Sequence, residues 1–318
     1  MKLVVLERNS VGTDIPVDCY EDFGEVTYYR NTVLEDCAEK VKDADIIIAN
    51  KAPMNERTLK DAANVKLICE FATGYDNVDL EYCKKRGIGV ANVKDYSTPA
   101  VAQHTIALAL YLIGHLPHYD RYVKSGEYAA QDRFSNFDLP FAELEGSTWG
   151  IIGMGNIGKK VAKIAAAFGC KVIFHSVTGK SSCNEYEQVD FDTLLAQSDI
   201  LSLHCPLSDL TRDLIEAEAL SKMKKTAVLI NVARGPVVNN KDLYEALVSG
   251  TIAAAGLDVL EREPITGDNP LGQIQDSNKL IITPHMAWAS TEARMRLVKE
   301  VYENIQAFIN GEERNRIV

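Results

Sequence analysis

Short apolar runs alternate with longer amphipathic segments along most of the chain. The first hundred residues contain expected strands at 3–6, 26–29, 46–49, 67–71 and 88–93, and expected helices at 32–41 and 80–85. From residue 149 onward the expected strands are 150–152, 171–174, 199–203, 227–232, 252–259 and 280–282. Apolar runs of this length, separated by helical segments, are typical of parallel βαβ units. The pattern predicts an α/β protein in two parts.

The glycine run at residues 153–158, Gly-Met-Gly-Asn-Ile-Gly, follows one of these strands and opens an Ala-rich helix. Gly153 permits a sharp turn, Gly155 lets the backbone approach a pyrophosphate, and Gly158 lets the helix lie close to the strand. The N–H groups and dipole of the helix then face the anion. A purely structural turn is the alternative, but the following strand at 171–174 completes a βαβ unit and favours dinucleotide binding.

A long apolar helix is expected from Ala100 to about residue 113, with Ser97 or Thr98 as its cap and Pro99 in its first turn. We interpret it as the crossover between two domains. Residues 119–147 are polar with scattered aromatic rings and show no clear period. They are either an arm that buries its rings against a partner subunit or a folded surface loop. The helix expected at 291–309 leads to no further strand, so we expect it to return to the first domain.

The composition of the chain limits the kinds of molecule that it is expected to bind. The 318 residues carry a net charge of −11, which disfavours nucleic acid and anionic membranes and requires a local cation for any anionic substrate. The seven cysteines form no C-x-x-C pair and no zinc-type cluster, so we expect reduced thiols and no metal. With no signal-peptide pattern and no apolar run of membrane-spanning length, we expect a cytoplasmic protein.

Three candidate chemical groups follow the ends of neighbouring strands, where an open parallel sheet binds its ligands. Arg234 can fork onto a carboxylate and a carbonyl, His285 can give or take a proton, and Glu263 can hold the imidazole ring. Taken singly, they could be a surface cation, a core histidine and a solvated acid. Their occurrence together at one sheet edge favours catalysis. The histidines at 104, 115 and 118 lack ligand partners at suitable spacing and are expected to pack or face solvent.

With these motifs in place, the sequence resembles the D-isomer-specific 2-hydroxyacid dehydrogenase family along nearly its whole length. The matching segments are 153–158, 231–238, 256–264 and 283–288, in the order that the family has them. The resemblance implies Arg234 as the substrate clamp, His285 as the acid/base and Glu263 as its partner. It also implies that Thr73 and Gly74 donate backbone N–H groups to the substrate carboxylate. From the residues alone, this loop could equally be an ordinary turn before a helix.

The resemblance further implies a Rossmann-type doubly wound sheet at 99–285 that binds the cofactor. A smaller flavodoxin-like substrate domain is expected at 1–98 and 286–318, and the usual assembly is a homodimer. The residues expected at the cofactor are Gly153, Met154, Gly155, Asn156, Ile157, Gly158, His175, Ser176, Thr178, His204, Cys205, Pro206, Val232, Ala233 and Asp258.

Within the family, segments 50–51, 72–75 and 287–294 look most like glycerate dehydrogenases, also called hydroxypyruvate reductases. Lys51 and the indole N–H of Trp288 could meet a hydroxymethyl group, although Trp288 could instead be an aromatic residue at the domain interface. The strand end near Ser176, Thr178 and Lys180 lacks the carboxylate that usually accepts from the ribose 2′-OH of NAD. This slightly favours NADPH over NADH, since these residues could bind a 2′-phosphate.

The sequence therefore predicts an oxidoreductase that transfers a hydride between NAD(P)H and a small 2-keto acid, with hydroxypyruvate or glyoxylate as the expected substrate. One alternative is a D-lactate-type or broad-specificity 2-hydroxyacid dehydrogenase. Another is a non-catalytic, NAD-sensing protein similar to corepressors that share these motifs. A formate or phosphite dehydrogenase is disfavoured by the segment around the histidine.

Overall fold

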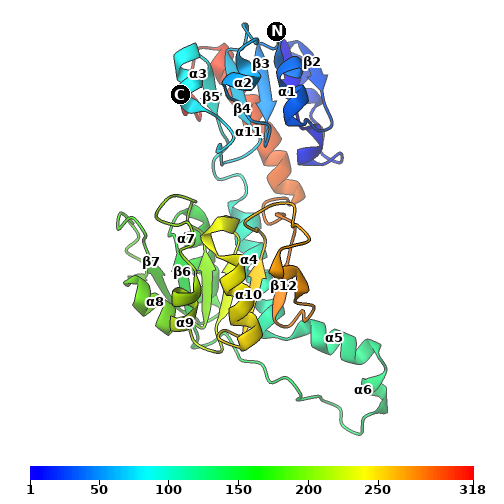
Figure 1. The fold of residues 1–318 in the computed structure, drawn as a ribbon, viewed down its shortest axis with the longest axis vertical. Helices are drawn as coiled ribbons and strands as arrows, with labels where there is room; N and C mark the ends of the chain where they lie inside the picture. Colours follow the sequence, from blue (N-terminus) through cyan, green and yellow to red (C-terminus); the bar gives the residue numbers. More distant parts are fainter. The chain divides into compact units, whose positions relative to one another are not determined.

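The computed structural model describes residues 1–318, which form two compact units (Figure 1). The first unit comprises Met1–Ser97 and Ala289–Val318, and the second comprises Thr98–Trp288. The sequence analysis places the corresponding boundaries after residues 98 and 285. Each unit is built on one parallel sheet, so the predicted α/β fold class is confirmed.

The first unit contains a five-stranded sheet in the order β2-β1-β3-β4-β5, with every neighbouring pair parallel. This is the flavodoxin-like order that the resemblance implies. The strands are β1 (Lys2–Val5), β2 (Glu25–Tyr28), β3 (Ile46–Ala49), β4 (Leu67–Glu70) and β5 (Gly89–Ala91). The interior strands β3 and β4 are buried at every position, as expected for strands covered on both faces.

One face of this sheet is covered by α1 (Leu34–Val41), α2 (Glu56–Leu59) and α3 (Leu80–Arg86), whose apolar side chains join those of the strands in one core. The chain's last helix, α11 (Thr291–Ile309), packs against β4, and Ser290 caps it by accepting from the Ala293 N–H. Two short 3-10 turns, η1 (Arg8–Val11) and η2 (Asp18–Phe23), follow β1. The expected return of the last helix to the first unit is confirmed.

The second unit contains a seven-stranded parallel sheet in the order β12-β11-β10-β9-β6-β7-β8. Numbered within the unit, its first six strands follow the doubly wound order 3-2-1-4-5-6. They are β6 (Thr148–Ile152), β7 (Lys171–His175), β8 (Glu187–Gln188), β9 (Ile200–Leu203), β10 (Val228–Asn231), β11 (Ala254–Leu257) and β12 (Leu280–Ile282). The sequence analysis expects six strands and misses β8, because its two residues are exposed and carry no apolar run.

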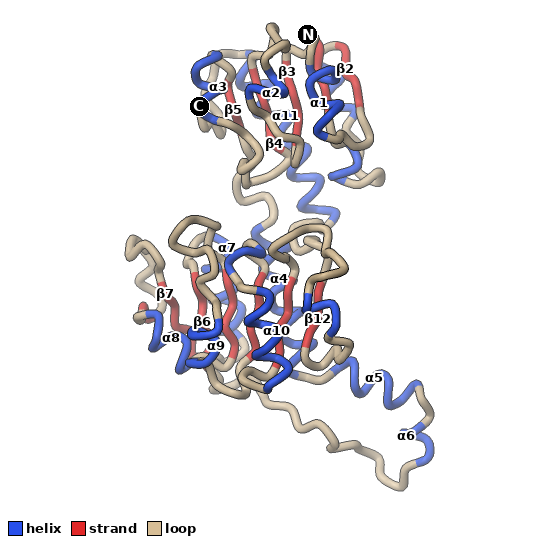
Figure 2. Tube along the Cα trace, viewed as in Figure 1, coloured by secondary structure: helices blue, strands red, loops and turns tan.

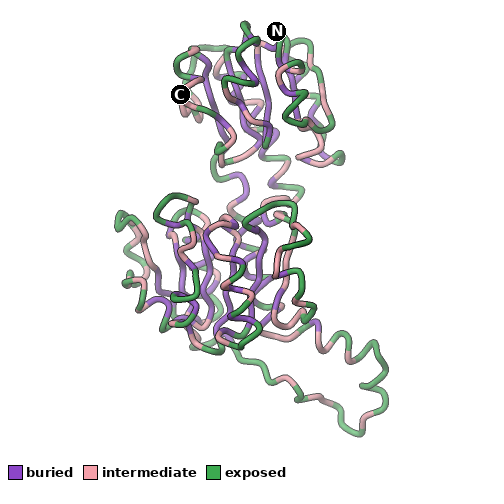
Figure 3. Tube along the Cα trace, in the orientation of Figure 1, coloured by how far each residue is buried: buried purple, intermediate pink, exposed green.

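Helices cover both faces of the second sheet (Figure 2). One face holds α4 (Thr98–Ile113) and α7 (Asn156–Ala167); the other holds α8 (Phe191–Gln197), α9 (Ala217–Lys222) and α10 (Asn240–Ser249). Two 3-10 turns, η3 (Gly235–Val237) and η4 (Pro270–Gln273), lie in the loops after β10 and β11. Figure 3 shows that the interior strands of both sheets are buried along most of their length, whereas the edge strands β2 and β8 contain no buried residue.

Residues 116–147 form an exposed arm of the second unit, which includes α5 (Leu116–Lys124) and α6 (Glu127–Ala130). These two short helices form although residues 119–147 show no clear period in the sequence. Their sequence gave little indication because α5 buries only Pro117 and α6 buries nothing. The rings of Phe134, Phe137 and Phe141 are 91, 71 and 64% exposed. No single helix passes the length and hydropathy test for a membrane span, while α4 and α5 pass it only as a pair bent by 59°.

A buried amide fixes α11 to the first unit, and its loss is expected to be costly. Asn304 donates to the Asn92 carbonyl at 3.0 Å and accepts from Arg314 and Asn315 at 3.0 Å each. Asn304→Ala leaves buried polar groups unpaired, so we expect it to lower the free energy of unfolding by about 1–3 kcal/mol in urea titrations. Gln306→Ala, at an exposed position of the same helix, should change it by less than about 0.5 kcal/mol. Equal effects of the two substitutions would contradict a structural role for the Asn304 network.

Candidate active site

The three candidate chemical groups follow three adjacent strands of the second unit. Asn231 at the end of β10 pairs with Leu257 of β11, and Leu257 pairs with Ile282 of β12. The carboxyl ends of these strands therefore lie at one level of the sheet. The loops that carry Arg234, Glu263 and His285 leave the sheet from this common edge, where ligands of open parallel sheets bind.

A close backbone contact joins the Arg234 loop to the Glu263 loop. A Cβ added at Gly235 would lie 1.7 Å from the Leu260 carbonyl oxygen, so only glycine permits this approach. The side chain of Asn231 closes the turn, because it donates to the Arg234 carbonyl at 3.0 Å and accepts from the Ala233 N–H at 3.0 Å. The guanidinium of Arg234 donates through Nη1 to the Ala233 carbonyl at 2.9 Å. These contacts fix the backbone from which Arg234 extends.

His285 and Glu263 form a hydrogen-bonded pair. Nδ1 of His285 lies 2.6 Å from Oε2 of Glu263, and Oε1 of Glu263 accepts from the Leu260 N–H at 3.0 Å. About a third of each side chain is exposed to solvent. His285 has a left-handed backbone with φ of 52°, and its N–H donates to the carbonyls of Asp258 and Thr283. Because the carboxylate takes Nδ1, the other ring nitrogen, Nε2, is left to exchange a proton with a ligand.

A buried carboxylate at the end of β11 supports the His285 loop. Asp258 is 2% exposed and accepts hydrogen bonds from the backbone N–H groups of Met286 and Ala287 at 2.9 and 2.8 Å. It also accepts from the Thr283 hydroxyl at 2.6 Å, and that hydroxyl lies 2.9 Å from Nε2 of His104. His104 was expected only to pack or to face solvent, so its place in this network was not predicted. Only the position of His104 on the buried face of α4 could have indicated it.

The glycine turn has the shape that a dinucleotide phosphate requires. Gly153 has φ of 94°, and a Cβ there would lie 2.7 Å from the backbone nitrogen of Cys205. A Cβ at Gly158 would lie 2.2 Å from the Gly153 carbonyl oxygen, whereas at Gly155 nothing lies within 4 Å. Helix α7 begins after Gly155 without a side-chain cap, so its first N–H groups face that open space. Protein atoms thus close the turn at Gly153 and Gly158, and the turn is open at Gly155, where a pyrophosphate would approach.

His204 adds a buried polar atom beside the same turn. Burial lowers its pKa to about 3, so the imidazole is neutral near pH 7. Its Nε2 lies 3.0 Å from the Ser202 hydroxyl, which also accepts from the Trp149 indole at 2.9 Å, while Nδ1 is buried without a partner. An unpartnered buried nitrogen in a native protein calls for a ligand or water. Cys205 is buried next to Gly153, and Pro206 is exposed.

The loop after β7 lies where the adenine ribose of a dinucleotide is expected in this fold. Nδ1 of His175 lies 3.2 Å from the Val189 carbonyl, and the residues that follow form a turn closed by the Gly179 N–H on the Ser176 carbonyl at 2.9 Å. The turn presents the hydroxyls of Ser176 and Thr178 and carries no carboxylate. Val232 and Ala233 lie in the loop after β10, and Ala233 is buried. The strand expected at 227–232 therefore ends one residue earlier than predicted.

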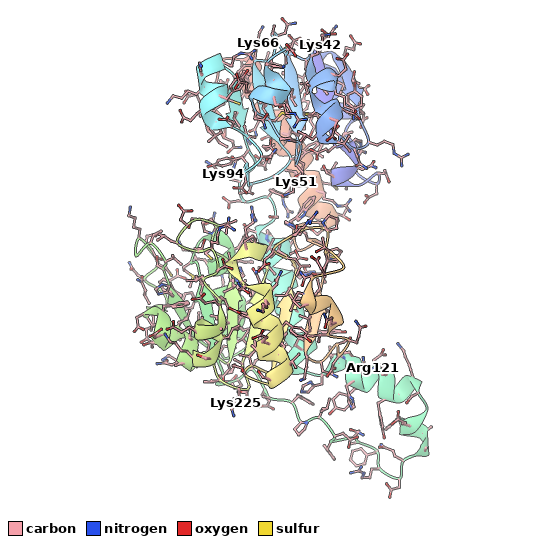
Figure 4. The ribbon with its side chains drawn as sticks, viewed as in Figure 1. Lys42, Lys51, Lys66, Lys94, Arg121 and Lys225 are labelled. Carbon is pink, nitrogen blue, oxygen red and sulfur yellow. The ribbon has the colours of Figure 1, made fainter.

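The remaining predicted substrate residues lie in loops at the carboxyl ends of the first sheet, apart from Trp288, which is the last residue of the second unit. The Thr73 hydroxyl donates to the Val93 carbonyl at 2.7 Å, and no hydrogen bond within the chain engages the backbone N–H groups of Thr73 and Gly74. Lys51 follows β3 as an exposed side chain. Figure 4 shows Lys51 and Lys94 at one end of this unit and Lys42 and Lys66 at the other.

Comparison with known proteins shows the family to which the chain belongs. The family model "D-isomer specific 2-hydroxyacid dehydrogenase, NAD binding domain" matches residues 106–287. A hydroxypyruvate reductase of Blautia hydrogenotrophica is 39% identical over 98% of this chain and 98% of its own length. The chain belongs to the D-isomer-specific 2-hydroxyacid dehydrogenase family. The predicted family and the predicted class of oxidoreductase are thereby confirmed.

Two further members of the family support the assignment over nearly the full chain. A glycerate dehydrogenase of Methylorubrum extorquens is 39% identical over 99% of this chain and 98% of its own length. The structure of a D-lactate dehydrogenase from Aquifex aeolicus, in complex with NAD and lactic acid, is 31% identical. It has a TM-score of 0.85 and covers 98% of this chain and 96% of its own. The present chain, a member of the same family, therefore uses a nicotinamide dinucleotide, NAD(H) or NADP(H).

The open space at Gly155 predicts a separation of cofactor binding from stability. Gly155→Ala should leave the free energy of unfolding nearly unchanged, since its Cβ meets no protein atom, yet weaken NAD(P)H binding about tenfold or more by occupying the phosphate approach. Nicotinamide fluorescence titration measures the binding. Gly267→Ala is the matched control, since its Cβ also meets nothing and the residue lies outside the turn. Unchanged affinity in Gly155→Ala would exclude a close phosphate at this position.

Proposed function

We propose that the protein reduces hydroxypyruvate or glyoxylate with NAD(P)H, giving D-glycerate or glycolate, and that it can also run the reverse oxidation. The single observation that carries this proposal is the hydrogen-bonded pair of His285 and Glu263 at the sheet edge that also carries Arg234. The names of the two relatives with 39% identity support the substrate class. The proposed domain roles follow from the sequence: the first unit binds substrate and the second binds cofactor.

In the proposed reaction the protein orients a keto acid and delivers one proton. Arg234 offers a planar guanidinium that can hold the substrate carboxylate and its carbonyl oxygen at the same time. Glu263 fixes the ring of His285 through Nδ1, so Nε2 can protonate the oxygen of the carbonyl group as it is reduced. The nicotinamide cofactor, when bound, supplies the hydride. The oriented ring and the guanidinium together hold the substrate in near-attack geometry.

We propose that the uncommitted N–H groups of Thr73 and Gly74 bind the substrate carboxylate, as the family resemblance implies. Lys51 and Trp288 would contact the hydroxymethyl group that distinguishes hydroxypyruvate from pyruvate. The residues after β7 support a slight preference for NADPH, since Ser176, Thr178 and Lys180 offer donors for a 2′-phosphate and no carboxylate opposes it. An arginine that could form a fork with this phosphate is missing from the turn, so use of NADH remains compatible with the site.

We also propose a homodimer that buries the arm at residues 116–147. The support is the set of large apolar side chains that the arm exposes: Leu116, Val123, Tyr128, Phe134, Phe137 and Phe141. Exposed rings gathered on one segment are typical of an association surface. The cytoplasm is the proposed location, since all seven cysteines are free and five of them are buried.

A substrate panel tests the proposal directly. We expect hydroxypyruvate and glyoxylate to give the highest kcat/KM, with pyruvate and 2-ketoisocaproate lower by about tenfold or more. The apolar side chains of these two analogues exclude water from the polar groups of the pocket and leave them unpaired, whereas the small hydrogen of glyoxylate leaves room for a water molecule there. Each substrate is run with NADH and with NADPH and followed by absorbance at the nicotinamide band. Equal rates with pyruvate would favour a D-lactate-type enzyme. No turnover with any keto acid would favour the NAD-sensing alternative.

Removal of the proposed proton donor should separate chemistry from cofactor binding. We expect His285→Ala to lower kcat by on the order of 10²–10⁴, because proton transfer then depends on water. Affinity for NAD(P)H, measured by fluorescence titration, should remain within about twofold of the wild type, which serves as the internal control. Wild-type turnover in His285→Ala would exclude this residue as the acid.

A further inference from the structure

The end of β4 carries a fully buried acid that the proposed reaction does not use. Glu70 is 0% exposed, and its Oε2 atom has no hydrogen-bond partner. It is two residues from Ile68 on the strand, so its side chain lies on the same face of the sheet, within the core that α1, α2 and α3 cover. The residues that follow it, 71–77, form the loop that contains Thr73 and Gly74. A buried acid next to a binding loop requires a physical explanation.

Glu70 is tied through Asn77 to a second loop, the residues 50–52 that contain Lys51. The amide nitrogen of Asn77 donates to Oε1 of Glu70 at 3.2 Å and to the Ala52 carbonyl at 2.9 Å. The Met54 N–H donates to the Asn77 carbonyl at 2.8 Å. Asn77 thus holds the 71–77 loop and the 50–52 loop in one arrangement, with Glu70 as the acceptor behind both.

A second acid holds the 50–52 loop from the other side. Oε2 of Glu7 accepts from three successive backbone N–H groups, those of Asn50, Lys51 and Ala52, at 2.7, 2.9 and 3.1 Å. A carboxylate bound by several amides is stable in its charged form. The two loops that carry the proposed substrate contacts of the first unit are therefore each anchored to an acid at the end of the sheet.

The charges around Glu70 favour its neutral form. The pKa of Glu70 is raised from 4.5 to about 8, and burial is the main cause. The negative charge of Glu7 contributes to the rise, whereas the Asn77 hydrogen bond and the positive charge of Lys51 oppose it. On the same face, burial raises the pKa values of Cys37 on α1 and Cys83 on α3 to about 11, so both thiols stay neutral through pH 9. Glu7 and Lys51 are therefore the charged groups that act on Glu70 in this range.

We propose that Glu70 is a positioning residue for the substrate loops: its neutral carboxyl group, through Asn77, holds the 50–52 and 71–77 loops in the arrangement that binds the keto acid. Ionisation of Glu70 strengthens its bond to Asn77, but it also places a second negative charge near Glu7 and attracts the ammonium of Lys51, which disturbs the arrangement of the 50–52 loop. This inference rests on the proposed function, since it takes these loops as the substrate contacts. Glu70 does not touch the reacting atoms in this scheme.

The consequence is a pH-dependent affinity for substrate. If only the form with neutral Glu70 binds substrate, the apparent KM is inversely proportional to the neutral fraction of Glu70. For a pKa near 8 that fraction falls about tenfold from pH 7 to pH 9, so the apparent KM rises about tenfold.

The free energy of unfolding also depends on the protonation of Glu70. Folding raises the pKa of this acid, so the chain takes up a proton when it folds between pH 4.5 and about 8. Stability therefore falls as pH rises through that window.

The first test compares Glu70→Gln with the wild type, since glutamine keeps the size of the side chain and cannot ionise. KM for hydroxypyruvate should agree within about twofold at pH 6.5, and the ratio of wild-type to variant KM should rise about tenfold by pH 9. The ratio of their kcat values should stay constant, which separates this effect from titration of the catalytic acid. Glu81→Gln, at an exposed position of α3, is the control and should follow the wild type. A KM ratio that does not change with pH would overturn the proposal.

The second test does not depend on turnover and so remains informative if the proposed substrate is wrong. Hydrogen–deuterium exchange of peptides covering 71–77 and 50–52, corrected for intrinsic rates, should increase between pH 6.5 and 9 in the wild type but not in Glu70→Gln. Asn77→Ala should show the faster exchange at both pH values, and a higher KM wherever turnover is found. Equal exchange in wild type and Glu70→Gln at pH 9 would overturn the role of Glu70. If the exchange rates change as expected but no keto acid is turned over, the result contradicts only the proposed function.

Discussion

The hydrogen bond between Glu263 and His285 is the interaction on which the candidate active site depends. It selects which imidazole nitrogen faces a ligand, and it does so only because three strand ends lie at one level of the sheet. The backbone around it is held by groups that do no chemistry. Asp258 binds two N–H groups of the His285 loop, and Gly235 lets the Arg234 loop approach the carbonyl of Leu260. The proposed reactive side chains project from a scaffold that consists of the buried carboxylate of Asp258 and close backbone contacts.

Patterns that repeat along the chain predict most of the strands and helices and the residues of the candidate site. The strands β3 and β12 and the helix α11 have the bounds that the apolar spacing indicates, because their side chains face a core with a regular period. The glycine turn and the candidate residues Arg234, Glu263 and His285 could be predicted for another reason. Each combines a residue type with a position in the fold that suits only a few chemical roles. The two-residue strand β8 and the helices α5 and α6 were not predicted, since they are short and bury almost no side chains: α5 buries only Pro117, and α6 and β8 bury none.

The supporting groups were harder to foresee for a different reason. His104 meets Thr283 across 179 positions of sequence, and Glu7 meets the loop after β3 across more than forty. No local pattern encodes such pairings, because they arise from the order of strands in the sheet. Glu70 is a further case: it ends a run that reads as an ordinary buried strand, and only its place beside Asn77 distinguishes it from a solvent-facing acid.

The return of α11 to the first unit has a consequence for how the chain is made. The second unit is an uninterrupted stretch, whereas the first needs residues from both ends of the sequence. On a ribosome, the long insert can complete its core while the earlier segment still lacks the helix that packs on β4. The face of β4 that α11 covers therefore stays exposed until residues 289–318 have emerged.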